Sequence, residues 1–219
     1  MVVRSYNQYC AVAKALDVVG DRWTLLIVRE LLLRGGCRYT DLQHGLPGIA
    51  TNLLGARLKE LEEHGLVRRE SAPPPVATTL YHLTDAGREI EPVLVALGRW
   101  GTRFMPEPTG EEVYRSHWLA FPVAQFLRDG EPDAPPATIE VRTGDEAAVI
   151  ELSGGDVTTR VGTAPEPDLV LQGDAPAVLG VLSGMLELED ARQLGLETTG
   201  SVAVLRRLRS EVGRHREPS

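Results

Sequence analysis

Apolar and polar residues follow a helical period between residues 51 and 63. Leu54, Leu58 and Leu61 recur at spacings that place them on one side of a helix. The opposite side of that helix carries Asn52, Ala56, Lys59 and Glu63. A Pro-Gly pair at residues 47–48 breaks the chain before this helix, and Gly65 is placed to end it. The pattern therefore predicts a helix with a leucine-backed face and a hydrophilic outer face.

The segments around that helix predict a winged helix. A short helix after Arg38 precedes it, a strand is expected to start at residues 66–67, and a return strand is expected at residues 80–83. Residues 71–79 include three consecutive prolines, so this part cannot be a regular ladder and is expected to form a wing. A short helix followed by a helix with a polar outer face suits insertion into the major groove of DNA. The alternative is an ordinary amphipathic helix on a small core.

Helices are also expected on both sides of this region. Two precede it, over residues 9–19 and 22–33, and Asp21 is the expected N-cap of the second. The core candidates of that second helix are Trp23, Leu26, Ile27 and Leu31. A long helix follows, beginning at the capping residue Thr84 and running to about Met105, with a kink at Pro92.

The helix over residues 84–105 carries a long apolar stripe. Its members are Ile90, Val93, Leu94, Leu97, Trp100 and Phe104. A stripe of this length exceeds what one small domain covers, so we expect it to pair with its counterpart and with the first helix in a homodimer. The expected interface residues are Leu16, Val93, Leu97, Trp100 and Phe104. The alternative is that the stripe packs onto the second half of the same chain.

The pattern changes in the second half, after a Pro-rich linker at residues 106–110. A helix is expected over residues 111–127, with a bend at Pro122, and strands follow at residues 138–142, 148–152, 157–161, 169–171 and 196–199. Helices are expected at residues 175–186 and 201–212. We expect two domains: a mainly-α winged helix-turn-helix over residues 1–106, and an α+β domain with an antiparallel sheet covered by helices over residues 107–219.

Charge separates the two halves. The chain of 219 residues has a net charge of −8, which taken whole argues against nucleic acid. Residues 1–104 hold 13 Lys and Arg against 11 Asp and Glu, a net charge of +2, whereas residues 105–219 hold 10 against 20, a net charge of −10. DNA binding is therefore expected in the first half only.

The composition indicates a cytoplasmic protein that is not an enzyme. No apolar run approaches the roughly 18 residues that a membrane span needs, and the N-terminus has no signal-peptide core. Two cysteines are too few for a disulfide framework or a Cys-rich zinc site. The five histidines have no metal-ligand spacing, and no P-loop, dinucleotide fingerprint or nucleophile elbow occurs, so we expect no metal, no cofactor and no membrane partner.

The first half resembles the HxlR-type family of bacterial winged-helix transcription regulators, which is related to the MarR type. The resemblance runs from Cys10 to Gly101 and rests on residues 20–27, 29–31, 38–39, 46–49, 57–58, 61–62, 65–67, 83–84 and 100–101. It implies a homodimer that binds double-stranded DNA. The chain departs from the family at Ala50 and Gly55, where hydroxyl residues are common, and its wing has no Lys or Arg between residues 71 and 79.

Nine residues are candidates for DNA contact: Arg38, Thr51, Asn52, Gly55, Ala56, Arg57, Lys59, Arg68 and Arg69. Asn reads adenine and Arg reads guanine through paired hydrogen bonds, which favours Asn52 and Arg57. The alternative for Arg57 is an ion pair with Glu60 at the domain surface. Arg38, Arg68 and Arg69 are expected to position the protein on phosphates, and Thr51 to cap the helix or touch phosphate.

Gly55 and Cys10 each allow two interpretations. A glycine inside a helix costs roughly 1 kcal/mol against Ala, so Gly55 either permits close approach to the DNA backbone or marks a weakened helix. Cys10 matches the cysteine that oxidation-sensing members of the family use, and it would need an exposed thiolate to act in this way. The alternative for Cys10 is packing inside the first helix.

The second half is similar to the sterol-carrier-protein-2-like fold. The resemblance covers residues 137–208 and rests on residues 168–174, 183–184 and 196–201. That fold implies an apolar tunnel for a lipid-like ligand, for which the candidate contacts are Trp118, Phe126, Leu182 and Met185. We expect a small apolar ligand to modulate DNA binding. The alternatives are a lipid carrier or docking module on a constitutive DNA binder, and a thiol-based redox sensor.

Overall fold

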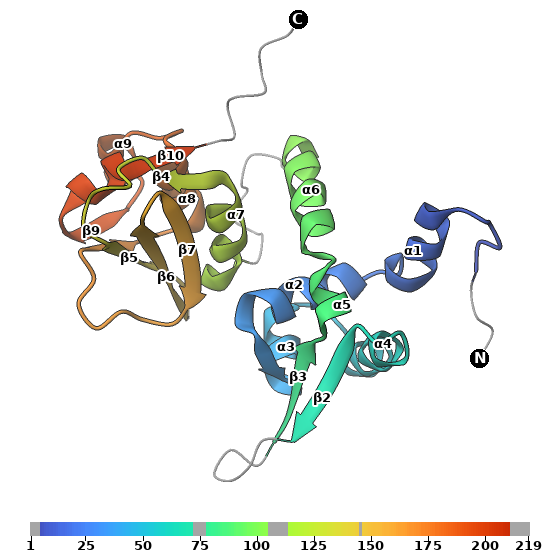
Figure 1. Ribbon diagram of the computed structural model, residues 1–219. Coiled ribbons are helices and arrows are strands. Elements are labelled where there is room, and N and C mark those ends of the chain that lie inside the picture. The colour runs from blue at the N-terminus through green and yellow to red at the C-terminus, as the bar shows by residue number, and fades with distance from the viewer. Residues whose placement is uncertain (1–4, 72–77, 105–113, 145, 211–219) are drawn as a thin grey trace, which may run out of the picture. The chain divides into compact units, whose positions relative to one another are not determined.

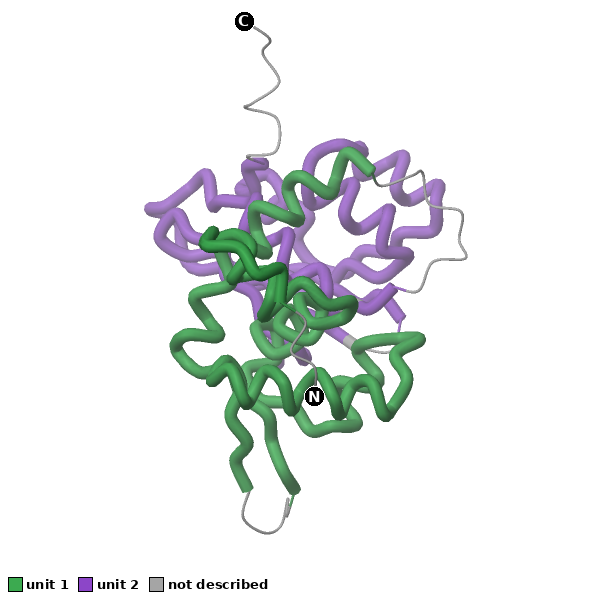
Figure 2. The backbone as a smooth tube through the Cα atoms, turned by 90° about the vertical axis from the view of Figure 1, so that its right-hand side faces the viewer, with its two compact units in different colours: residues 1–104 green, residues 105–219 purple. Residues whose placement is uncertain are grey.

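The structure, a computed structural model, describes residues 5–71, 78–104, 114–144 and 146–210. The chain forms two units, Met1–Phe104 and Met105–Ser219 (Figure 2). The expected domain boundary at residue 106 and the linker at residues 106–110 lie outside the described residues.

Unit 1 contains the predicted winged helix. Its helices and strands are α1 (Ala11–Val19), α2 (Thr24–Arg34), β1 (Gly36–Arg38), α3 (Tyr39–Gly45), α4 (Thr51–Glu63), β2 (Val67–Ser71), β3 (Thr79–Leu83), α5 (Asp85–Arg88), α6 (Glu91–Gly101) and the 3-10 turn η1 (Thr102–Phe104) (Figure 1). The strands form an antiparallel sheet in the order β1-β3-β2. The order α3, turn, α4, β2, β3 confirms the prediction, and the tip of the wing at residues 72–77 lies outside the described residues. The short strand β1 is not predicted by the sequence pattern.

The leucine face of α4 is buried as predicted. Leu54, Leu58 and Leu61 are each at most 2% exposed, so this side of the helix faces the core of unit 1. Gly65, at φ +72, terminates the helix in the left-handed conformation that glycine adopts without strain. Burial of the leucines fixes the rotation of α4 about its axis, and the hydrophilic side is left at the surface.

Two local expectations for unit 1 are wrong. Asp21 does not cap α2, because the residue before the helix is Trp23, at φ +82. Thr84 does cap a helix, through a bond from the backbone N–H of Gly87, but that helix ends at Arg88. Pro92 lies in the first turn of α6, where its missing N–H is tolerated, so it separates two helices rather than kinking one.

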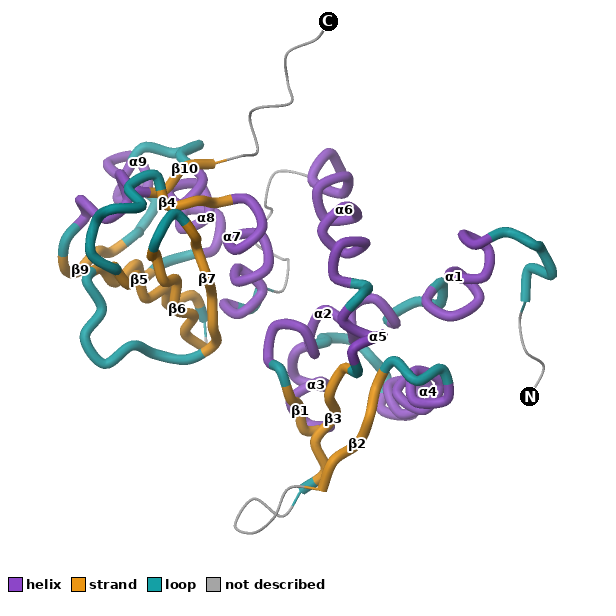
Figure 3. The backbone as a smooth tube through the Cα atoms, in the orientation of Figure 1, coloured by secondary structure: helices purple, strands orange, loops and turns teal. Residues whose placement is uncertain are grey.

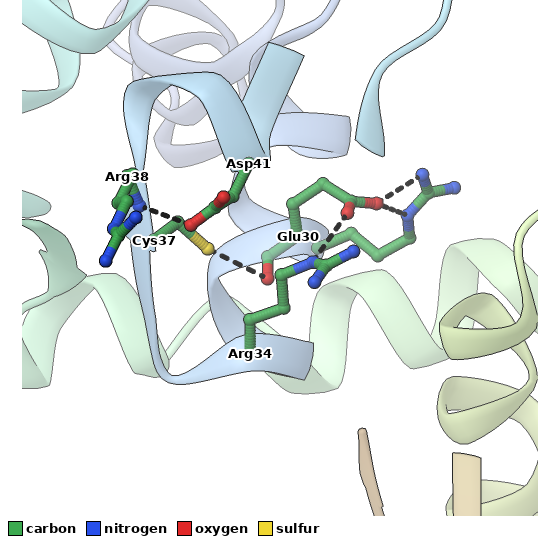
Figure 4. A network of polar contacts seen from close by, with 6 residues as sticks. Glu30, Arg34, Cys37, Arg38 and Asp41 are labelled. Carbon is green, nitrogen blue, oxygen red and sulfur yellow. Dashed lines mark hydrogen bonds and ion pairs between the residues drawn. The ribbon is translucent and has the colours of Figure 1, made fainter. Parts of the chain in front are cut away.

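The buried carboxylate of Glu30 on α2 lies in a cluster of polar contacts (Figure 4). Glu30 is fully buried, and its Oε1 lies 2.8 Å from a terminal nitrogen of Arg29 while its Oε2 lies 3.7 Å from Nε of Arg34. The last residue of α3 is Gly45, and a Cβ there would collide with Oε2 of Glu30. The thiol of Cys37, on β1, donates to the backbone carbonyl of Glu30 at 3.9 Å. This cluster therefore sets how closely α3 approaches α2.

Unit 2 is an α+β unit, as expected. Its elements are η2 (Ser116–Leu119), α7 (Ala120–Phe126), β4 (Leu127–Asp129), β5 (Ala137–Thr143), β6 (Glu146–Ser153), β7 (Asp156–Val161), β8 (Leu169–Gln172), α8 (Ala175–Ser183), α9 (Leu188–Gln193), β9 (Glu197–Gly200), η3 (Val202–Arg207) and β10 (Leu208–Ser210) (Figure 3). Five strands form one sheet in the order β7-β6-β5-β8-β9, and β4 pairs with β10 in a second.

One apolar core joins the larger sheet of unit 2 to its helices. The sheet contributes Ile139, Val141, Ile150, Leu152, Leu169 and Leu171, and the helices contribute Leu119, Val123, Val178 and Leu182. The predicted hairpin at residues 153–156 is confirmed, with Gly154 and Gly155 at φ +61 and +93 in its turn. The hydroxyl of Thr159 on β7 also donates to the carbonyl of Ala120 on α7.

Three expectations for unit 2 are wrong in part. The sheet is mixed, because β5 pairs with β8 in parallel. The expected helix at residues 111–127 is a 3-10 turn and the short helix α7 over residues 116–126, and its first three residues lie outside the described part. The expected closing helix at residues 201–212 is η3 followed by β10, as far as residue 210.

A buried ion pair lies where η3 meets β10. Arg207 donates from Nε to one oxygen of Asp129 at 3.0 Å and from Nη2 to the other at 2.6 Å. It also donates to the carbonyl of Pro135 at 2.6 Å. The hydrogen bonds from Arg207 lower the pKa of Asp129 below its ordinary value, so the carboxylate stays charged against β10.

We predict that Glu30→Gln destabilises unit 1 by about 3 kcal/mol, because the fully buried carboxylate beside the guanidinium groups of Arg29 and Arg34 loses its charge. Urea unfolding followed by circular dichroism measures this change. Glu63→Gln is the matched control, since Glu63 is an exposed partner of Lys59 and its loss costs less than about 1 kcal/mol. Equal, small losses for both variants would contradict the structural role of Glu30.

Candidate nucleic-acid interface

The outer face of α4 presents the predicted polar residues to solvent. Asn52, Ala56 and Lys59 are exposed, on the side opposite the buried leucines. The side-chain oxygen of Asn52 accepts only from the neighbouring amide of Leu53, at 3.0 Å, among the bonds of the described residues. Its amide nitrogen is thus available to a ligand on this face. These three residues meet the geometric condition for groove contact, and their role in binding DNA stays a prediction.

The start of α4 is held by α3. The hydroxyl of Tyr39 donates to the backbone carbonyl of Thr51 at 2.5 Å, and Nε2 of Gln43 donates to the hydroxyl of Thr51 at 2.9 Å. Ala50 occupies the N-cap position and supplies no side-chain bond. The sequence pattern did not identify Tyr39 and Gln43 as supports for α4, because their contacts cross the turn between the two helices.

Arg57 is placed differently from its neighbours on α4. Its side chain is only 15% exposed, and Nη1 lies 2.6 Å from Oδ2 of Asp21 and also contacts Oε2 of Glu60. Its Nε is buried and has no hydrogen-bond partner within the described chain. This geometry favours the structural alternative for Arg57 over a groove contact. The pairing with Asp21 was not predicted, since the residues are far apart in sequence.

The other basic candidates in α4 and β2 also lie beside carboxylates. Lys59 pairs with Glu63 at 3.5 Å, Arg68 with Glu70 at 2.5 Å and Arg69 with Glu62 at 2.7 Å. The hydrogen bond from Arg68 lowers the pKa of Glu70, and the hydrogen bond to Glu62 raises the pKa of Arg69. The three cations are more than half exposed, so their ion pairs contribute little to stability.

Arg38 and Gly55 complete the candidate surface. Arg38 is exposed at the N-cap of α3, and its backbone N–H donates to Oδ2 of Asp41 at 2.9 Å. Gly55 is half-buried on α4, and a Cβ there would have Tyr39 Oη as its nearest neighbour at 3.7 Å, an ordinary contact. No packing contact inside the described chain therefore requires a glycine at position 55.

The two cysteines lie in opposite environments. Cys10 is exposed at the N-cap of α1, so the alternative of burial inside that helix is wrong. Cys37 is fully buried, and burial raises its pKa to about 12, which keeps the thiol protonated and unreactive. Of the two, only Cys10 has the exposure that oxidation sensing requires, and its role as a sensor stays a prediction.

The expected dimer residues are exposed and the expected ligand residues are scattered. Leu16, Val93, Leu97, Trp100 and Phe104 are all exposed on α1, α6 and η1. In unit 2, Leu182 belongs to the core and Met185 is 78% exposed, while Trp118 and Phe126 are half-buried. The described residues contain no cluster of His, Cys, Asp and Glu that could hold a metal ion, and none of their helices is long and apolar enough to cross a membrane.

Known proteins resemble the first half of the chain. The family model described as HxlR-like helix-turn-helix matches residues 18–109. The uncharacterised HTH-type transcriptional regulator sll1512 of Synechocystis is 35% identical over 102 residues, which are 47% of this chain and 75% of the relative. The uncharacterised HTH-type transcriptional regulator YvaP of Bacillus subtilis is 37% identical over 92 residues, 42% of this chain and 84% of the relative.

Among solved structures, the redox regulator HypR in its oxidised form has 31% identity and a TM-score of 0.40. The match covers 44% of this chain and 99% of that chain.

We predict that Gly55→Ala stabilises unit 1 by about 1 kcal/mol, because alanine favours the helix and the added methyl group has room. Chemical denaturation measures the change. Gly65→Ala is the control, since its φ of +72 makes any side chain unfavourable and the variant is expected to be less stable. A destabilised Gly55→Ala would refute this account, and weaker duplex binding by the stabilised variant would indicate close approach of a DNA backbone.

Proposed function

Because the chain belongs to the HxlR-like helix-turn-helix family, we propose that two copies of it bind duplex DNA together and regulate transcription. Its relatives sll1512 and YvaP are named as HTH-type transcriptional regulators. The observation that carries the proposal is the hydrophilic face of α4, which three buried leucines hold toward solvent. In a two-fold dimer, one such helix per copy addresses half-sites about one helical turn apart, roughly 34 Å.

The second copy is proposed from apolar surface that unit 1 leaves exposed. In α1 the only buried residue is Ala13, and in α6 it is Leu94. Large apolar side chains are exposed on these helices and beside them: Tyr6, Tyr9, Val12, Leu16, Val93, Leu97, Trp100 and Phe104. Exposed apolar surface of this extent is typical of protein interfaces. In Figure 1, α6 extends away from the three-stranded sheet of its own unit, which supports its role as a dimerisation helix.

Trp100 and Phe104 are suited to anchor that interface. Their rings stack edge to face with centroids 4.7 Å apart, and the guanidinium of Arg103 lies 6.0 Å from the Trp100 ring. Preformed aromatic clusters of this kind lose little side-chain entropy when a partner covers them.

We predict that Leu97→Glu converts the homodimer to a monomer and abolishes binding to duplex DNA from upstream of its own gene, because a charge would be buried in the interface. Sedimentation velocity and gel shift measure the two effects. Leu194→Glu, at an exposed leucine of unit 2, is the matched control and should leave both unchanged. A wild-type protein that is monomeric and does not bind duplex DNA at low salt would refute the proposal.

A second candidate function is regulation by a small apolar ligand in unit 2, and one observation favours it. The hydroxyl oxygen of Tyr114 is buried and has no hydrogen-bond partner within the described residues. Burial also raises the pKa of Tyr114 above its ordinary value, so the hydroxyl stays a donor. An unpartnered buried donor costs about 1–3 kcal/mol, a cost that a ligand with a polar acceptor would remove. The Tyr114 ring meets the ring of Trp118, a candidate ligand residue, at 6.2 Å.

We predict that Tyr114→Phe binds a fluorescent fatty-acid probe about five- to tenfold more weakly than the wild type, because one hydrogen bond of about 1 kcal/mol is lost. Fluorescence titration measures the affinity, and thermal unfolding should show no loss of stability. Equal affinities would refute the role of Tyr114, and no saturable binding by the wild type would refute the effector site and leave a constitutive DNA binder whose second unit is a docking module.

The exposure of Cys10 keeps thiol-based sensing open as a further mode of regulation.

A further inference from the structure

Arg57 connects the middle of α4 to the turn between α1 and α2. Its Nη1 lies 2.6 Å from Oδ2 of Asp21 in that turn, and the same nitrogen contacts Glu60 one turn further along α4. The Arg57 side chain is 15% exposed, whereas Asp21 and Glu60 are 45% and 41% exposed. The guanidinium group is therefore enclosed by two carboxylates instead of projecting from the helix surface.

The turn that carries Asp21 is itself held in an unusual conformation. Trp23 adopts φ +82 and ψ −22, a region that non-glycine residues enter at a cost of about 1–3 kcal/mol and keep only where the surroundings impose it. The end of the Trp23 ring would lie 3.9 Å from a Cβ at Gly48, in the turn before α4. The turn thus reaches the helix-turn-helix at two places, beside Gly48 through Trp23 and at Arg57 through Asp21.

We propose that Asp21 and Arg57 are positioning residues: their ion pair sets the orientation of α4 for DNA, and Arg57 does not itself contact DNA. This inference rests on the proposed function of α4. Base and phosphate contact then belongs to the exposed residues of the same face, Asn52, Ala56 and Lys59. The pair also links α4 to the end of α1, the helix whose apolar surface we assign to the dimer.

Removing the charge of Asp21 distinguishes a positioning role from simple repulsion of phosphate, because the two predict opposite changes in DNA affinity. Asp21 is an exposed carboxylate near the DNA-facing helix, so removing its charge should strengthen binding if Asp21 only repels phosphate. If Asp21 positions α4, its removal weakens binding. The salt dependence separates the roles of Arg57, because each phosphate contact contributes about −0.9 to the slope of log K against log salt.

The experiment measures affinity for duplex DNA from upstream of the gene at several salt concentrations, for the full-length wild type, Asp21→Asn, Asp21→Glu, Arg57→Ala and Lys59→Ala. We expect Asp21→Asn and Arg57→Ala to weaken binding about tenfold with unchanged salt slopes, and Asp21→Glu to restore most of the affinity. Lys59→Ala, on the exposed part of α4, provides the reference for a lost phosphate contact; a dimer loses two such contacts, so the slope is expected to be smaller by about 1.8. Thermal unfolding confirms that each variant is folded at the temperature of the titration.

Binding by Asp21→Asn that is as tight as the wild type or tighter, or a salt slope reduced by about 1.8 in Arg57→Ala, overturns the proposal. A wild type that binds no duplex refutes the proposed function instead. The positioning role is then decided on the free protein by amide hydrogen exchange, where Asp21→Asn should accelerate exchange in α4 and leave unit 2 unchanged. Unchanged exchange in α4 overturns the positioning role.

Discussion

Burial of three leucines on one side of α4 is the constraint on which the rest of unit 1 depends. Leu54, Leu58 and Leu61 are almost completely buried, and each such side chain contributes about 1.5–3 kcal/mol when it leaves water. Rotating α4 about its axis would expose these leucines, so the hydrophilic side of the helix must face solvent. The strands β2 and β3, the turn before α4 and the bonds from Tyr39 and Gln43 all act around a helix whose outward face is already fixed.

Unit 1 pairs many of its basic side chains with carboxylates. The cations on α4 and β2 each lie beside a carboxylate; Arg68 and its partner Glu70 are both exposed, whereas Arg69 is exposed and its partner Glu62 is half-buried. Binding to DNA would therefore replace one set of ion pairs by another, a process that depends on salt and on the exact distribution of charge rather than on net charge. Arg57 and Glu30 differ from these surface pairs, because their burial makes the pairing part of the fold.

The two units use their apolar residues in different ways. Unit 2 gathers them into one core between a mixed sheet and its helices, and the buried pair of Asp129 and Arg207 ties β4 to the end of the described chain. Unit 1 leaves much of α1 and α6 uncovered, with the aromatic pair of Trp100 and Phe104 at the surface. A helix with this much exposed apolar surface is stabilised when a second copy covers it. The family membership and the exposed apolar helices are independent observations, and both support the proposed DNA-binding homodimer.

The sequence by itself determined several features that depend on neighbours a few residues apart. The leucine period of α4, the glycine that ends it, the strands β2 and β3 and the hairpin at residues 153–156 were predicted, and the similarity to HxlR-type regulators followed from residues in a fixed order. The cap at Asp21 and the kink at Pro92 were local expectations that were wrong. Periodicity also placed Leu97 and Trp100 on one apolar side of a helix, and the structure shows that both are exposed within the single chain.

Only the tertiary structure decided features that join distant parts of the chain. Strand β1, the parallel pairing of β5 with β8, and the strand β10 in place of a helix depend on partners that no local pattern identifies. The environment of Arg57 is of the same kind. Its spacing placed it on the helix predicted to face DNA, but in the fold its guanidinium lies 2.6 Å from the carboxylate of Asp21, in the turn that precedes α2. Local sequence sets which side chains share a face of a helix, whereas the energy of burying a charge depends on which distant residue the fold places beside it.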